Sequence, residues 1–167
     1  MDDFSYPDHI EPDLFFAESE DYVPTTIMFV QTVMKHECSQ ALTVLFDPGS
    51  KYTYFNETAL PHGATPLLLD KAEYPSTAGG HFKVTRAVNL SSLSFPEFSK
   101  SLKYDSIQAR LFRQPSCRYD VIIGRDFLNE AKLDLCFSDG NMRWSDRVVP
   151  MKKASEPFAL FIDLLMG

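Results

Sequence analysis

The chain has no long hydrophobic run, and this absence narrows the class of protein. None of its apolar stretches approaches the roughly 20 residues that a membrane-spanning helix needs. The N-terminus begins with Asp2 and Asp3, whereas a secretory signal begins with positive charge. We therefore expect a soluble, unsecreted, cytoplasmic protein with no membrane partner.

Cysteine is scarce, and the patterns that mark metal and cofactor sites are missing. An odd number of cysteines without close spacing is neither a disulfide framework nor a zinc motif, and we expect reduced thiols at Cys38, Cys117 and Cys136. The histidines show no ligand spacing either. Neither a phosphate-binding glycine loop nor the Gly-x-Ser-x-Gly pattern of a serine nucleophile occurs. We expect no metal and no cofactor.

Basic charge is also limited, which argues against nucleic-acid binding. Residues 1–21 hold eight acids and no lysine or arginine, so the remainder has 15 acids (23 minus eight) against 16 bases. A nearly neutral body lacks the basic face that a nucleic acid requires. We interpret residues 1–21 as an acidic tail that is either disordered or docked through its apolar side chains, which are Phe4, Tyr6, Leu14, Phe15 and Phe16.

The remainder is long enough for one domain with a substantial core, and its pattern is mostly that of strands. Residues 25–34 and 41–46 are apolar and β-branched, and a polar stretch between them predicts a hairpin. Alternating apolar positions predict strands over residues 81–90 and 106–112, and only residues 125–131 favour a helix. Further short strands are expected at residues 52–55 and 67–69. This pattern indicates a small barrel or sandwich.

The apolar strand over residues 41–46 delivers a single carboxylate, that of Asp47, into a tight turn. Pro48 and Gly49 are residues that turns favour, so Asp47-Pro48-Gly49-Ser50 alone indicates an ordinary turn. A second motif lies far downstream, where an apolar strand ends at Ile123-Gly124 and runs directly into the expected helix. Gly124 permits close approach of the backbone, so this strand can lie beneath a neighbouring turn.

Together the two motifs resemble the retropepsin family, the aspartic proteases of retroviruses and long-terminal-repeat retrotransposons. The similarity covers residues 24–144 and includes Phe46 to Ser50, Thr53 and Phe55. The segment over residues 119–137 is similar to proteases of gypsy-type retrotransposon polyproteins. Between the motifs, a glycine-containing segment resembles the family's flap hairpin, which closes over substrate, and comprises Thr77, Ala78, Gly79 and Gly80.

The resemblance implies an all-β fold: a single-lobe, closed retropepsin-like barrel with one short C-terminal helix. It places a protease domain at residues 22–150 and a C-terminal extension or linker at residues 151–167. It also implies a homodimer in which Asp47 and its symmetry mate cleave a polypeptide, the retroelement polyprotein. Gly49 would admit the substrate backbone and Ser50 would hydrogen-bond the Asp47 carboxylate. The floor would be braced by the structural residues Ile123, Gly124 and Arg125.

Two departures from the family pattern leave a second function open. Pro48 stands where the family usually has threonine or serine, and it provides neither a hydroxyl nor a backbone N–H. Lys51 stands where many retroviral members have an acid that pairs with the arginine equivalent to Arg125, so Asp126 or Asp120 is an alternative partner for that arginine. The alternative function is a catalytically impaired dimerisation or peptide-binding module. A further hypothesis is self-processing at two apolar pairs, Phe15-Phe16 and Leu160-Phe161.

Overall fold

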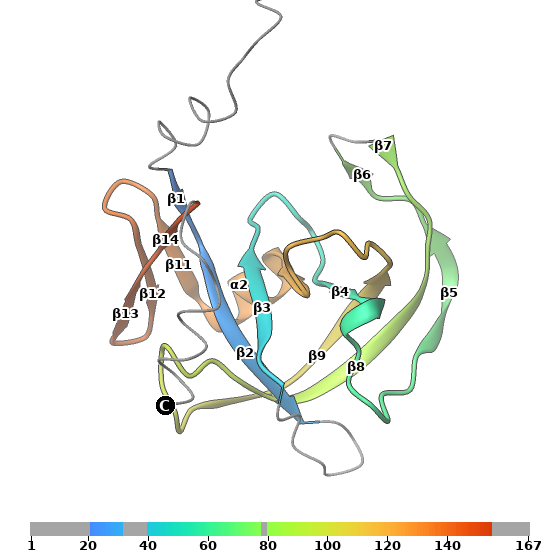
Figure 1. The fold of residues 1–167 in the computed structure, drawn as a ribbon, viewed down its shortest axis with the longest axis horizontal. Helices are drawn as coiled ribbons and strands as arrows, with labels where there is room; N and C mark the ends of the chain where they lie inside the picture. Colours follow the sequence, from blue (N-terminus) through green and yellow to red (C-terminus); the bar gives the residue numbers. More distant parts are fainter. Residues whose placement is uncertain (1–20, 32–39, 78–79, 155–167) are drawn as a thin grey trace, which may run out of the picture.

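A computed structural model describes residues 21–31, 40–77 and 80–154 (Figure 1). Several predictions concern residues outside these ranges. They are the state of the acidic tail, the tip of the predicted flap at Ala78 and Gly79, and the two apolar pairs at Phe15-Phe16 and Leu160-Phe161.

Six strands form a closed barrel. Their hydrogen-bonded order is β2-β3-β10-β4-β9-β8, and a further pairing of β2 with β8 closes the ring. The strands are β2 (Thr25–Gln31), β3 (Leu42–Phe46), β4 (Tyr54–Asn56), β8 (Val84–Ser94), β9 (Lys103–Phe112) and β10 (Val121–Ile123). The prediction of an all-β protein with a closed barrel is confirmed, and the sandwich alternative is wrong. The predicted helix also forms, as α2 (Arg125–Ala131).

The long strand β8 joins the barrel to an outer strand. Its C-terminal half pairs with β2 from Ser91 to Ser94, and its N-terminal half pairs with β5 (Leu67–Glu73). Both neighbours are antiparallel to β8 and share one edge of it, because β9 occupies the other edge. The barrel therefore splays open beyond β2, and β5 forms an outer wall there (Figure 1).

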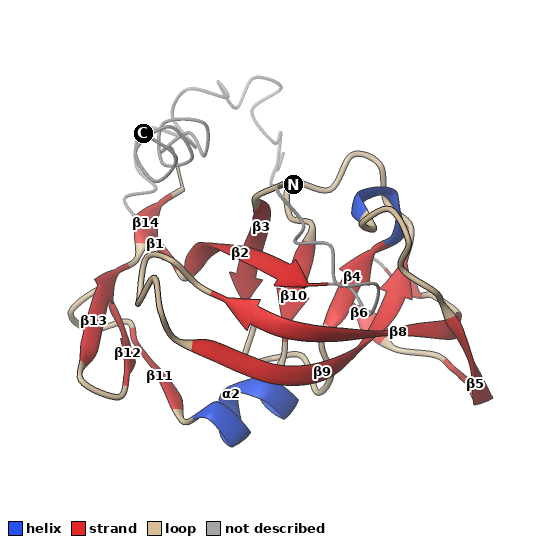
Figure 2. Ribbon diagram, turned by 90° about the horizontal axis from the view of Figure 1, so that it is seen from below, coloured by secondary structure: helices blue, strands red, loops and turns tan. Residues whose placement is uncertain are grey.

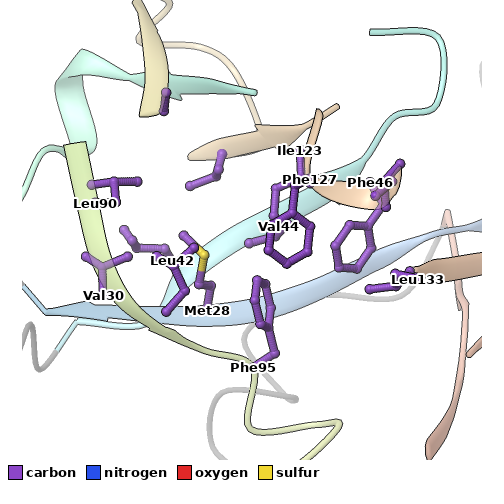
Figure 3. Packing of buried hydrophobic residues seen from close by; sticks show 14 of the residues in the cluster. Met28, Val30, Leu42, Val44, Phe46, Leu90, Phe95, Ile123, Phe127 and Leu133 are labelled. Carbon is purple, nitrogen blue, oxygen red and sulfur yellow. The ribbon is translucent and has the colours of Figure 1, made fainter. Parts of the chain in front are cut away.

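Alternation of buried and less buried residues explains how β3 enters the core. Leu42, Val44 and Phe46 are at most 1% exposed, whereas the residues between them are partly exposed. This two-residue period directs one face of the strand into the barrel. Phe46 lies 6.1 Å from Phe95 between ring centroids, and Phe95 lies 5.6 Å from Phe127 of α2 (Figure 3). The core thus extends from the barrel to the inner face of the helix.

A smaller antiparallel sheet lies at one end of the barrel, and β5 lies at the opposite end (Figure 2). Its strands are β11 (Leu133–Cys136), β12 (Asn141–Trp144) and β13 (Arg147–Pro150). The remaining elements are a 3-10 helix, η1 (Glu57–Ala59), the short strand pair β1 (Tyr22–Val23) and β14 (Lys152–Lys153), and the hairpin of β6 (Ser76–Thr77) and β7 (Gly80–His81).

The predicted domain end at residue 150 is too early. Met151 is 4% exposed within the hydrophobic core, and Lys152 is 6% exposed. The Lys152 ammonium donates to Glu97 Oε2 at 2.7 Å and to the carbonyl of Thr25 at 3.1 Å. The folded body therefore continues to β14, because Met151 is buried in the core and the buried Lys152 ammonium is paired with Glu97.

Candidate active site

Asp47 follows β3 directly and lies where β3 and β10 run side by side. These two strands are parallel, with Phe46 opposite Ile123. The Asp47 N–H donates to the carbonyl of Ile123 at 2.8 Å, which extends the ladder by one residue. The Asp47 side chain is partly buried and lines a cleft of about 1120 Å³.

The turn that follows Asp47 differs from an ordinary glycine-containing turn in the role of Gly49. The Ser50 N–H donates to the Asp47 carbonyl at 3.1 Å, which closes a four-residue turn with Pro48 and Gly49 at its centre. Gly49 does not use the positive φ that glycine allows. Instead its N–H donates to Asp47 Oδ1 at 2.9 Å, and a Cβ there would lie 3.1 Å from the same oxygen. Glycine is favoured at this position because a side chain would crowd the Asp47 carboxylate.

The predicted bond from Ser50 to the Asp47 carboxylate is wrong. The Ser50 hydroxyl donates to the carbonyl of Tyr52 at 2.7 Å. This bond pairs the Tyr52 carbonyl inside the loop that leads from Asp47 to β4, and it thereby stabilises that loop. Within the described residues, the hydrogen bond that the Asp47 side chain accepts comes from Gly49.

A buried polar cluster anchors this loop to α2. Thr53 is 1% exposed, and its hydroxyl donates to Asp126 Oδ1 at 2.8 Å while its N–H donates to Asp126 Oδ2 at 3.0 Å. The Gly124 N–H in turn donates to the Thr53 hydroxyl at 3.2 Å. The Asp126 carboxylate lies in the first turn of α2, where negative charge is favourable.

Backbone contacts complete the anchor. The N–H groups of Arg125 and Asp126 donate to the carbonyls of Ser50 and Lys51 at 2.8 and 3.2 Å. A Cβ at Gly124 would lie 2.4 Å from the Tyr52 carbonyl oxygen, so only glycine fits between loop and helix. Gly124 and Arg125 thus hold the loop against the helix, and Arg125 does so through its backbone.

The Arg125 side chain does not pair with either carboxylate that the sequence suggested. Asp126 is bonded to Thr53, and Asp120 Oδ2 accepts from the Thr43 N–H at 2.9 Å. Arg125 is exposed and lines the cleft, and its guanidinium has no ion pair within the described residues.

In Figure 1 the hairpin of β6 and β7 stands apart from the turn that follows β3, on the side of the molecule where β5 runs. Ser76 pairs with His81 and Thr77 with Gly80, so the predicted hairpin forms in the part that the structure describes. Ser76 and Phe82, at the base of the hairpin, line the same cleft as Asp47. The two features that the sequence analysis connected therefore face one cavity.

Charged and aromatic side chains that the sequence analysis did not single out form the wall beneath this hairpin. Arg86 of β8 pairs with Glu57 of η1, and Arg110 of β9 pairs with Glu73 of β5 at 3.2 Å. The Arg110 guanidinium also lies 3.6 Å from the ring centroid of Tyr52. Each of these ion pairs joins residues from two different elements, so no short-range pattern in the sequence indicates it.

Tyr54 connects the floor of the cleft with the hairpin. Its ring meets that of Phe82 edge-on, with 5.9 Å between centroids. Burial raises the pKa of the Tyr54 phenol above its ordinary value, and the negative charge of Glu73 raises it further. The phenol is therefore neutral through the physiological range and serves as a hydrogen-bonding group.

A scan against protein-family models and a search of curated proteins both find no match to this chain. Within the described ranges, no three His, Cys, Asp or Glu side chains are grouped to hold a metal ion. None of the helices described is long and apolar enough to cross a membrane.

Proposed function

We propose that the chain is an aspartic endopeptidase of the retropepsin type that acts as a homodimer. The observation that carries this proposal is the setting of Asp47. Its carboxylate lies at the end of a buried strand, in a cleft of about 1120 Å³, on a loop that Thr53, Gly124 and Asp126 fix to the barrel. Such a fixed carboxylate in a concave site is suited to proton transfer.

The chemistry requires a second carboxylate. Two carboxylates about 3 Å apart share one proton, because both cannot ionise at that distance. The ionised member takes a proton from water, whose oxygen attacks the peptide carbonyl carbon. The protonated member donates its proton to the amide nitrogen, so that the C–N bond breaks and a carboxylic acid and an amine are released. Glu57 and Glu73 also line the cleft, but each is paired with an arginine. We therefore assign the second carboxylate to Asp47 of another copy, related by a two-fold axis.

The hairpin and the turn have separate roles in this proposal. An extended peptide in the cleft would pass beside Gly49, where the lack of a side chain leaves room for its backbone. The hairpin that includes Thr77 and Gly80 would cover the peptide and exclude water from the reacting atoms. The substrate class is a polypeptide, and the resemblance to gypsy-type elements favours a retrotransposon polyprotein.

Pro48 favours the second candidate function, a peptide-binding or dimerisation module that has lost catalysis. Pro48 is exposed at the centre of the turn and lacks the hydroxyl and N–H that would link two such turns. Loss of such bonds costs about 1 kcal/mol each. The Gly49 N–H still donates to Asp47, so the carboxylate keeps one hydrogen bond from its own turn.

Cleavage of a peptide library at mildly acid pH tests the proposal. The native chain is expected to cleave, Asp47→Asn to be inactive, and Pro48→Thr to be at least as active as the native chain. Asp134→Asn is a matched control because Asp134 is exposed on β11 and does not line the cleft. Inactivity of the native chain with activity in Pro48→Thr would support the impaired module. Equal cleavage by the native chain and by Asp47→Asn would exclude both candidate functions, the Asp47-dependent endopeptidase and the impaired module.

A further inference from the structure

The cleft that contains Asp47 carries a surplus of unpaired positive charge. Three acids and five bases line it: Asp47, Glu57, Glu73, Lys51, Lys83, Arg86, Arg113 and Arg125. The chain as a whole has a net charge of -7. The surplus is therefore local, and it is opposite in sign to the charge of the molecule.

Ion pairs made by two of the lining acids increase this excess of positive charge. Glu57 is neutralised by Arg86, and Glu73 is neutralised by Arg110, which lies outside the lining. Asp47 is then the one lining acid without an ion pair in the described part of the chain.

Four lining cations have no carboxylate partner among the described residues, namely Lys51, Lys83, Arg113 and Arg125. All four are exposed, and they come from different sides of the cleft. Lys51 and Arg125 lie on the Asp47 side, Lys83 follows the hairpin, and Arg113 follows β9. A ligand in the cleft would be surrounded by them.

We propose that this cleft selects polypeptide segments that carry acidic residues on both sides of an apolar centre. The cations provide the acidic preference, because like charges in a cleft concentrate ligands of opposite sign. Tyr54, Phe82 and Leu111 line the same cavity and provide an apolar surface for the centre. The inference rests on the proposed function in that it assigns the substrate class of the same site.

A peptide fits this surface better than a nucleic acid does. Outside the cleft, residues 22–167 hold 12 acids (15 minus three) and 11 bases (16 minus five), so a long polyanion would find no excess of positive charge once it left the cavity. A short peptide with an apolar centre would keep its charges within the cleft and would also meet the apolar surface of Tyr54, Phe82 and Leu111. An oligonucleotide is therefore the competing ligand that the experiment must include.

The residues 10–21 of this chain offer a suitable probe, because five acids flank an apolar centre at Leu14, Phe15 and Phe16. A labelled synthetic peptide of this sequence is compared with a neutral version in which each Asp is Asn and each Glu is Gln. Binding is measured by fluorescence anisotropy on the full chain with Asp47→Asn, so cleavage does not interfere. The acidic peptide is expected to bind about tenfold more tightly at low salt, with a preference that declines as salt rises.

Charge-reversal variants locate the preference. Lys83→Glu combined with Arg113→Glu is expected to abolish it, whereas Lys100→Glu, an exposed lysine outside the cleft, is expected to leave it unchanged. Equal affinity for both peptides, or a preference that survives the double reversal, would overturn the inference. Equally tight binding of an oligonucleotide of matched charge would overturn it in favour of a nucleic-acid ligand.

The binding experiment and the cleavage assay of the native chain together separate this inference from the proposed function. Acidic preference without cleavage by the native chain would leave the inference standing and remove the enzyme. Cleavage by the native chain without an acidic preference would remove the inference and leave the proposed enzyme standing.

Discussion

The two sides of the cleft are held by different kinds of interaction. On the Asp47 side, buried hydrogen bonds from Thr53 and Gly124 and a carboxylate in the first turn of α2 fix the loop. On the opposite side, β5 pairs with β8 alone among the described strands, its Leu68 is 82% exposed, and the ion pair of Arg86 with Glu57 is partly solvated. We call these the floor and the wall.

The difference indicates a division of roles. In the proposed function, bonds among buried groups would hold the Asp47 carboxylate within a narrow range of positions, because their loss leaves unsatisfied polar atoms. Solvated ion pairs and a single strand pairing contribute less, so the wall should deform at a smaller cost in free energy than the floor. The floor is then the part that variants should damage most.

The largest effect is expected at Gly124. In Gly124→Ala the new Cβ meets the backbone oxygens of Tyr52 and Ser50 at 2.4 and 2.7 Å, and these cannot move aside. We expect the free energy of unfolding to decrease by about 3 kcal/mol, measured from urea denaturation. Gly49→Ala is the matched control, because its Cβ meets only a side-chain oxygen at 3.1 Å. Equal losses in the two variants would contradict the account.

A smaller loss is expected when the buried threonine of the floor is changed. Thr53→Val keeps the shape of the side chain but leaves Asp126 Oδ1 and the Gly124 N–H without their bonds to the hydroxyl. The expected loss in unfolding free energy is about 2 kcal/mol. Thr85→Val, at an exposed threonine of β8, should be nearly neutral in the same denaturation experiment.

The wall should respond less than the floor. Arg86→Ala removes an ion pair in which the arginine side chain is 41% exposed and the glutamate side chain 22%. We expect a loss of less than about 1 kcal/mol, and a smaller one at high salt, because solvent screens such a pair. A loss that matches that of Thr53→Val would remove the distinction between floor and wall.

An effect confined to high pH is expected at Tyr104, whose ring lies 4.7 Å from that of Phe127 on the helix beneath the floor. Burial, a hydrogen bond with Glu130 and nearby negative charges raise the pKa of this phenol from 10.0 to about 12. The stability that this shift provides is complete below pH 10 and is lost as the pH rises towards about 12.

An ultraviolet titration of tyrosinate checks this prediction. The component with the highest midpoint should disappear in Tyr104→Phe and move to lower pH in Glu130→Gln. A titration that is unchanged in Tyr104→Phe would show that the phenol has its ordinary pKa.

The sequence predicted those features that short-range patterns determine. Alternation at Leu42, Val44 and Phe46 identified the strand that carries Asp47, and the composition of residues 125–131 identified the helix with its bounds. The two-motif resemblance also connected Asp47 with Gly124. These features depend on the order of residue types within a few positions.

The polar contacts of the site were not predictable in the same way. Thr53 and Asp126 are 73 residues apart, and many carboxylates in the sequence would have been equally suitable partners. Ser50 had two acceptors within reach, and the fold selects the Tyr52 carbonyl. Which distant groups meet depends on the closure of the barrel, and local patterns do not encode it.

The central claim is that Asp47 is half of a catalytic site completed by a second copy. Mixing native chain with an equal amount of Asp47→Asn, after exchange of subunits, tests it at constant concentration of the native chain. If two Asp47 residues are required, mixed dimers are inactive and the cleavage rate falls to about half. Asp134→Asn in place of Asp47→Asn should increase the rate instead. A rate that Asp47→Asn leaves unchanged would show that one chain acts alone and would contradict the account.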